Sequence, residues 1–160
     1  MDLEAPADAW YVWLGVAVVS IGLAGIVAGL PAQPPPDAAR VAGTVDRVAA
    51  TEHAATATVE HDASAIRVGT ERIALRNDGG TTHARIAYGR MVDVRTVEPT
   101  RREPLLALLN GTTTTDQHRD LLHELASGSA TTTGDWRPAR GSLRVRRVTL
   151  GDEPLLLIDA

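Results

Sequence analysis

The chain has 160 residues and a formal net charge of −4, and all sixteen of its basic residues are arginine. This acidic balance argues against a nucleic-acid partner, because phosphate binding needs a positively charged surface. The chain contains no cysteine, which excludes disulfides, thiolate catalysis and cysteine-based metal sites.

A long uncharged apolar run near the N-terminus is the strongest signal in the sequence. Residues 9–30 contain no charged side chain, and as a helix they would rise about 33 Å, enough to cross the ~30 Å hydrocarbon core of a bilayer. Trp10, Tyr11 and Trp13 cluster at one end, where amphipathic rings settle among lipid headgroups. We therefore expect an N-terminal tail over residues 1–8 and one transmembrane helix over residues 9–30.

A cleaved secretory signal is the alternative interpretation of this run. Such signals begin with a basic segment, but Asp2, Glu4 and Asp8 are the charged residues before the run. The run is also longer than a signal requires, and Leu30-Pro31-Ala32 is a poor cleavage site. The sequence therefore favours a retained, single-pass anchor in the cell membrane.

Glycines recur along the apolar run with the spacing of one helix face. Gly15, Gly22 and Gly29 lie seven residues apart, and Gly25 forms a small-xxx-small pair with Gly29. Small residues let a second helix approach closely in lipid, so these four positions are candidates for helix packing. Glycine is also common in membrane helices without such a role, and the sequence leaves both interpretations open.

Two features point to opposite orientations in the membrane. Arg40 and Arg47 follow the apolar run, and the positive-inside rule would place them and the domain in the cytoplasm. Asn110-Gly111-Thr112 is an N-glycosylation sequon, which would place the domain outside the cell with Asn110 as the modified residue. The residues alone do not choose between the two.

The remainder of the chain reads as a linker and one domain. Residues 31–37 form a Pro-rich linker, which we expect to be a stiff, extended spacer. Asp37 is placed to cap a helix that runs to about Ala50 and carries its valines on one face. Residues 38–160 are expected to fold as a single unit.

Short alternating patterns predict a meander of antiparallel strands after this helix. Asn77-Asp78-Gly79-Gly80 is a strong hairpin turn, and the returning strand keeps apolar residues on even positions from Ala84 to Val94, with a bend at Gly89. Four consecutive strands are therefore predicted, around residues 55–60, 66–68, 73–75 and 84–94.

Two helices and a second hairpin follow in the pattern. A short helix is expected over Pro104–Asn110, and a longer one over Thr115–Ser127 with Leu121, Leu122 and Leu125 facing the sheet. The final strands are expected over residues 142–150 and 154–159, with a bulge near Arg146 and Arg147 to correct a change of apolar parity. The whole predicts an α+β fold: one N-terminal transmembrane helix, then a small domain with an antiparallel sheet packed by two or three short helices.

One helix carries the best arrangement of acids and histidines. The group consists of Asp116, Asp120, His123 and Glu124, with His118 nearby. Converging oxygen and nitrogen ligands could hold a divalent cation, but a solvated helix face with local charge pairing accounts for the same residues and is the favoured interpretation. His61 shares the parity of buried residues and is expected to be partly buried, with its ring hydrogen-bonded. The sequence therefore assigns no catalytic, cofactor-binding or metal-ligating residue.

Four segments carry a resemblance to a known family: residues 1–6, 8–15, 34–37 and 156–160. Together with the Lys-free, Ala-, Thr- and Val-rich composition, they resemble an uncharacterised haloarchaeal membrane-protein family that accompanies type IV pilus-like machinery. The resemblance implies a membrane-anchored, non-enzymatic pilin-like or accessory subunit with its domain outside the cytoplasm. Its expected partners are membrane lipid and other membrane or pilus-like subunits.

The chain departs from a pilin in two respects. No basic leader precedes the apolar run, and the prolines of residues 31–36 should interrupt the long helix that packs a pilus core. These departures favour an accessory subunit over a major pilin. Two alternative functions stay open: a membrane-tethered ligand-binding or sensor domain, and a membrane-tethered metal-dependent hydrolase that uses the helix from Asp116 to Glu124.

Overall fold

The N-terminal helix stands as a unit of its own. The computed structural model describes residues 9–29, 33–127, 134–150 and 153–160, and the chain divides into the units Met1–Ala32 and Gln33–Ala160. Helix α1 (Ala9–Ala28) is apolar on every side, and the span Trp10–Ala28 is long and apolar enough to cross a membrane. The predicted apolar helix is confirmed.

Helix α2 (Ala38–Ala49) opens the second unit and forms for the predicted reason. The Asp37 carboxylate accepts a hydrogen bond from the backbone N–H of Arg40 at 2.9 Å, which satisfies one of the free donors of the first turn. The apolar stripe of the helix, Val41, Val45 and Val48, is buried against strands of both sheets. The helix predicted from Asp37 to about Ala50 is confirmed.

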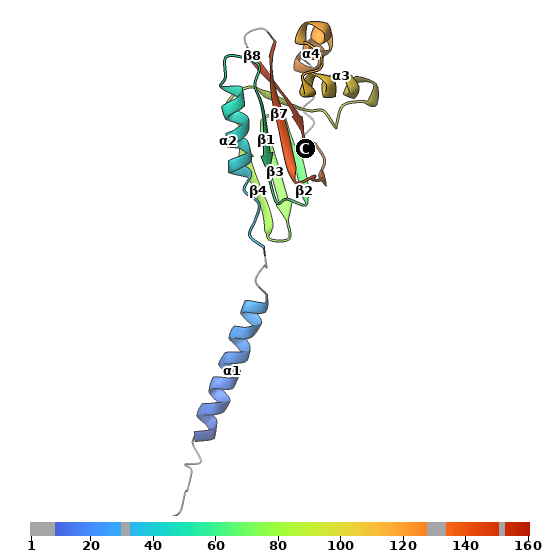
Figure 1. Ribbon diagram of the computed structural model, residues 1–160. Helices are drawn as coiled ribbons and strands as arrows, with labels where there is room; N and C mark the ends of the chain where they lie inside the picture. The colour runs from blue at the N-terminus through green and yellow to red at the C-terminus, as the bar shows by residue number, and fades with distance from the viewer. Residues whose placement is uncertain (1–8, 30–32, 128–133, 151–152) are drawn as a thin grey trace, which may run out of the picture. The chain divides into compact units, whose positions relative to one another are not determined.

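The strands of the described residues make two four-stranded sheets (Figure 1). Sheet 1 has the order β1-β7-β8-β5, and sheet 2 has the order β4-β3-β2-β6. The strands of sheet 1 are β1 (Thr56–Glu60), β7 (Ser142–Leu150), β8 (Glu153–Asp159) and β5 (Arg90–Asp93). Those of sheet 2 are β4 (Gly80–Arg85), β3 (Arg72–Asn77), β2 (Ala65–Val68) and β6 (Arg137–Pro138).

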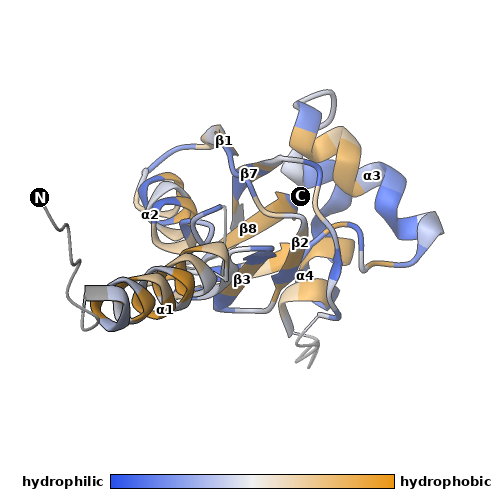
Figure 2. Ribbon diagram, turned by 90° about the horizontal axis from the view of Figure 1, so that it is seen from below, coloured by the Kyte–Doolittle hydropathy of each residue, from blue (hydrophilic) through white to orange (hydrophobic). Residues whose placement is uncertain are grey.

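Sheet 1 lies between two apolar clusters. One face of β8 places Leu156 and Ile158 in a cluster shared with α2 and the inner face of sheet 2. Its other face places Leu155 and Leu157 in a second cluster, against α3 (Pro99–Asn110) and α4 (Arg119–Ser127). Figure 2 shows the central part of β8 coloured as hydrophobic. A strand buried on both faces needs such a continuous apolar run rather than an alternating one.

This double burial corrects the predicted bulge in β7. The pairing of β7 with β8 is continuous from Arg144 to Leu150, so the strand has no bulge near Arg146 and Arg147. The parity of the apolar residues changes because Val145 belongs to the first cluster and Val148 to the second. The strand keeps its register with β8, and its apolar residues change from one buried face to the other between Val145 and Val148.

The predicted four-stranded meander is wrong in two places. Strand β1 pairs with β7, far along the chain, and has no pairing with β2. The returning strand is two strands: β4 ends at Arg85, and β5 joins sheet 1, where it pairs in parallel with β8. Gly89 makes the break possible, with φ of +76° and a position where a Cβ would lie 2.7 Å from the backbone oxygen of Pro154.

The helices after β5 follow the predicted order with one changed boundary. Helix α3 begins at Pro99, five residues earlier than predicted, because Pro99 takes the first helical turn and Pro104 is tolerated inside the helix. The predicted helix Thr115–Ser127 forms as a 3₁₀ turn, η1 (Thr115–His118), followed by α4. Leu122 is fully buried, and Leu121 and Leu125 pack at the edge of the same cluster, as predicted. The α+β class of the fold is confirmed.

The Pro-rich segment is attached to the β3–β4 hairpin. The carbonyl oxygen of Pro34 accepts a hydrogen bond from the Asn77 side-chain amide at 2.9 Å, and that of Pro36 accepts one from the Thr82 hydroxyl. Gly79, in the turn, approaches the segment so closely that a Cβ would lie 1.9 Å from the Gln33 oxygen. We call this contact the linker clamp. It makes Gln33–Pro36 part of the folded unit.

We therefore predict that the starting residue decides the stability of a soluble fragment. A fragment of residues 33–160 should be soluble and unfold cooperatively, whereas a fragment of residues 37–160 should be less stable by about 1–3 kcal/mol, because two hydrogen bonds of the clamp lose their acceptors. Thermal unfolding followed by circular dichroism measures the difference. Equal stability of the two fragments would contradict a role for the clamp.

Candidate functional site

The acid and histidine group on η1 and α4 does not converge. Asp116 is paired with Arg119 at 2.5 Å and Glu124 with Arg101 at 2.7 Å, both pairs at the surface. In the part of the chain that the structure describes, no three histidine, cysteine, aspartate or glutamate side chains are placed to hold a metal ion. Asp116 and Glu124 therefore form local ion pairs, which is the interpretation that the sequence favoured.

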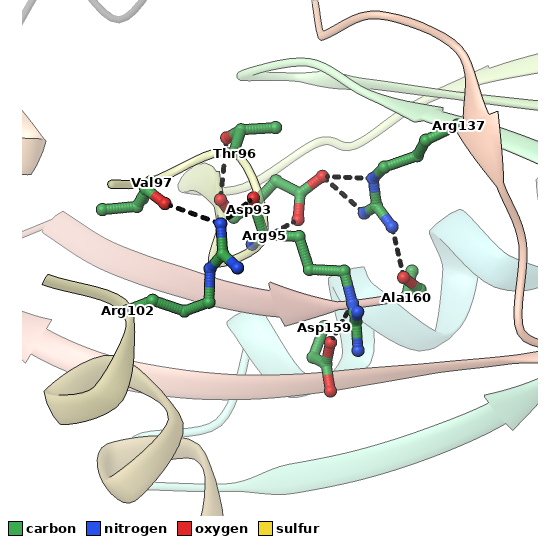
Figure 3. A network of polar contacts seen from close by, with 8 residues as sticks. All are labelled: Asp93, Arg95, Thr96, Val97, Arg102, Arg137, Asp159 and Ala160. Carbon is green, nitrogen blue, oxygen red and sulfur yellow. Dashed lines mark hydrogen bonds and ion pairs between the residues drawn. The ribbon is translucent and has the colours of Figure 1, made fainter. Parts of the chain in front are cut away.

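A buried polar network lies where the two sheets meet (Figure 3). Its centre is Asp93, at the end of β5, whose side chain is only 4% exposed. One carboxylate oxygen accepts hydrogen bonds from Nε and Nη2 of Arg137 at 3.0 and 2.5 Å. The other accepts one from the backbone N–H of Arg95 at 3.0 Å. Since Arg137 belongs to β6 of sheet 2, the ion pair joins the two sheets.

Neighbouring groups extend the network along the chain after β5. Arg95 pairs with Asp159 at 2.6 Å, Arg137 also donates to the backbone oxygen of Ala160, and Arg102 donates to the carbonyl oxygens of Arg95 and Val97 at 2.9 and 3.1 Å. These contacts fix the turn that leads from β5 to α3. They also hold the last residues of β8 against sheet 2.

The chemistry of this network is structural. Both oxygens of Asp93 accept hydrogen bonds from groups that hold the fold together. The sequence analysis missed Asp93 and Arg137. A charged residue between Val92 and Val94 was the available signal, but its partner lies 44 residues away and no local pattern connects the two.

We predict that breaking this ion pair costs far more than breaking an exposed one. Asp93→Ala leaves the partly buried Arg137 guanidinium without its counter-charge and should lower the free energy of unfolding by about 2–4 kcal/mol. Glu71→Ala, which breaks the exposed pair with Arg85, is the matched control and should cost at most about 1 kcal/mol. Urea unfolding of the fragment 33–160, followed by the fluorescence of its single tryptophan, Trp136, measures both values. Similar losses would contradict the role of Asp93.

His61 is the other buried polar side chain that stands out. It follows β1, is 7% exposed, and both ring nitrogens lack a hydrogen-bond partner among the described residues. Burial lowers the pKa of His61, the nearby charge of Arg40 lowers it further, and the charge of Asp62 opposes both. The predicted burial of this histidine is confirmed, but the expected hydrogen bonding of its ring is wrong for the described residues. A buried imidazole without partners is held in its neutral form.

This lowered pKa predicts that the domain loses stability in acid. As the pH falls below about 6.5, the unfolded chain binds a proton at His61 before the folded chain does, so the free energy of unfolding decreases until the lowered folded pKa is reached. His61→Phe removes the titrating group and should flatten this dependence between about pH 7 and 5. His53→Gln, at an exposed position, is the control. A slope unchanged by His61→Phe would overturn the prediction.

The glycines and the sequon lie at the surface. A Cβ at Gly15, Gly22 or Gly25 would meet no atom within 4 Å, and one at Gly29 would meet only backbone of its own helix. Asn110 ends α3 and is exposed, and its side-chain oxygen accepts a hydrogen bond from Arg144 at 2.7 Å. These positions are accessible, and their roles in helix packing and glycosylation stay predictions.

The fold and its polar contacts define a class: an α+β domain that follows a single apolar helix able to span a membrane. Within that class the chain belongs to DUF7283, a family of unknown function, which matches residues 4–148. No curated protein and no solved structure matches the chain.

Proposed function

We propose that this protein is a membrane-anchored, non-enzymatic subunit that acts by binding other proteins. The observation that carries the proposal is α1, which is apolar and exposed along its described side chains. Such a surface is stable in lipid, whereas in water it would favour aggregation. The domain that follows has its own core, and its most buried carboxylate is engaged in structural contacts. Binding is therefore the role that the geometry supports best.

The assembly that we propose is pilus-like, with this chain as an accessory subunit. An apolar helix, an amphipathic helix and a C-terminal antiparallel sheet are the parts of a pilin, and α1, α2 and the strands follow that order. Helices α1 and α2 do not form the long unbroken helix of a pilus core, because α1 ends at Ala28 and α2 begins only at Ala38. Membrane lipid and other membrane subunits are the partners in this proposal.

We further propose that the domain lies outside the cytoplasm. The exposure of Asn110, within the only N-glycosylation sequon of the chain, supports this side. Cleavage of the domain by a protease added to intact cells would agree with the proposal, and complete protection would contradict it.

The glycine stripe of α1 provides the test of the membrane half of this function. Gly22→Leu with Gly29→Leu should weaken association with a partner helix severalfold, because branched side chains at a close crossing hold the backbones apart. Insertion should persist, since leucine is more favourable in lipid than glycine. The measurement is copurification from membranes of two differently tagged copies, and of other membrane proteins, at equal expression.

A matched control adds the same kind of bulk to the opposite face of α1. Ala17→Leu with Ala24→Leu has the same seven-residue spacing, and it should leave association unchanged. If both double variants, or neither of them, reduce copurification, the stripe is ordinary membrane-helix composition and the proposed packing face is wrong.

A further inference from the structure

The outer face of sheet 2 concentrates positive charge in a chain whose net charge is negative. The register of β2, β3 and β4 places residues of one parity on this face, opposite to the parity of the buried Ile66, Ile73 and Leu75. The long side chains on the outer face are those of Arg67, Arg72, Arg76, His83 and Arg85. We call this surface the arginine face.

The side chains of the arginine face enclose a hollow. Ala74, at its centre, points outward yet is only 2% exposed, since the long stems around it close over the methyl group. The hollow has a volume of about 470 Å³ and is lined by Arg67, Arg72, Arg85 and Arg90 among other residues. Glu71 also lines it and pairs with Arg85, and Arg90, from β5, donates to the Ala126 carbonyl oxygen. Arg67 and Arg72 therefore remain to bind the negative groups of a ligand.

The charges of this face are mostly not neutralised within the domain. Glu71 pairs with Arg85 at 3.2 Å, but no carboxylate of the described residues lies within ion-pair distance of Arg67, Arg72 or Arg76. Elsewhere in the domain, Arg95, Arg101, Arg119 and Arg137 each have a carboxylate partner. Among the described residues, Arg67, Arg72 and Arg76 are therefore available to an anionic partner.

Trp136 orders two of these arginines. The guanidinium carbons of Arg67 and Arg76 lie 5.0 and 4.6 Å from the centre of the Trp136 ring. Such cation–π contacts hold the long side chains in place and lower the entropy lost when a partner binds. A tryptophan bordered by arginines is also the composition typical of the residues that dominate protein–protein binding.

From this arrangement we infer that the arginine face binds an acidic segment of a partner protein in an extended conformation. Arg72 and Arg76 lie on the same side of β3, four residues or about 13 Å apart along the backbone, so an elongated ligand with separate negative groups can engage both. An extended peptide presents every second side chain to one side, about 7 Å apart, so glutamates four residues apart can meet Arg72 and Arg76. Guanidinium and carboxylate groups can then form paired hydrogen bonds.

Two other polyanions fit the face less well. A bilayer surface is usually bound with apolar side chains that enter it, but the one large apolar side chain exposed in the described part of this unit, Tyr88, lies in the loop after β4. Single-stranded nucleic acid is bound by stacking on aromatic rings, and the Trp136 ring is already contacted by two guanidinium groups.

Binding of an acidic peptide would be a specific form of the proposed binding function and rests on it. Its experiment uses the full chain in nanodiscs of zwitterionic lipid. A fluorescent peptide of alternating glutamate and serine is titrated with this protein, and the matched peptide with glutamine in place of glutamate is the neutral probe. We expect the acidic peptide to bind, more weakly at high salt, and the neutral peptide not to bind.

Two variants locate the binding surface. R72Q/R76Q removes two unpaired charges at exposed positions of the arginine face and should weaken peptide binding at least about tenfold. R101Q/R119Q removes the same charge from α3 and α4 and should leave binding unchanged. Circular dichroism of both variants checks that the fold is retained, and R67Q is the substitute if R72Q/R76Q does not fold.

The result that overturns the inference is an acidic peptide that does not bind, or that binds both double variants with equally reduced affinity. Tighter binding of a single-stranded oligonucleotide, or of nanodiscs that contain anionic lipid, would overturn it as well and assign the face to that polyanion. Copurification through α1 is measured separately, so the membrane half of the proposed function can hold while this inference fails.

Discussion

Burial of β8 on both faces is the constraint on which the rest of the domain depends. Its apolar side chains alternate between two clusters, one closed by α2 and sheet 2 and the other by α3 and α4. Removal of either layer would expose one face of the strand to water. The free-energy cost would be roughly 25 cal/mol for each Å² of exposed apolar surface. Since β8 also pairs with β7 and β5, it supports the layers on both sides and its neighbours within the sheet.

The buried polar contacts lie between the two sheets, where apolar packing alone does not fix the position of one sheet against the other. Sheet 2 shares a cluster with sheet 1 but no strand pairing, so its position along the seam needs a directional contact. The pair of Asp93 and Arg137 supplies one, because a carboxylate saturated by three donors tolerates little displacement. A buried ion pair adds little net stability compared with apolar packing. We attribute to this pair, together with the hydrogen bond from the Met91 N–H to the Thr70 carbonyl oxygen, a part in fixing the relative position of the sheets.

Local patterns in the sequence predicted which helices and strands form far better than they predicted which strands pair. Helices α1 and α2 and the β3–β4 and β7–β8 hairpins followed from apolar periodicity, a capping aspartate and turn residues, all of which act within a few positions. The pairing of β1 with β7 and of β5 with β8 depends on residues far apart in the chain, about which a local alternation carries no information. The same limit hid the contact of Asp93 with Arg137.

The parity change in β7 illustrates a second limit. Val145 and Val148 face opposite sides, and a pattern with one buried face could accommodate them only through a bulge. Because both faces of β7 are buried, the two valines need no bulge. The layer that covers the second face is built by α3 and α4, which lie elsewhere in the sequence. The arginine face was equally hidden, since its members are spread over three strands and only the pairing register brings them to one side.

The linker clamp also has a mechanical consequence. Residues 34–36 are bonded to the β3–β4 hairpin before the chain enters α2. Tension that reaches the domain along the backbone from α1 is therefore transmitted first to the side chains of Asn77 and Thr82, and through them to the edge of sheet 2. The core around α2 bears that load only after these two contacts separate. Under such tension the two contacts to the hairpin would break first, before the hydrophobic core is strained.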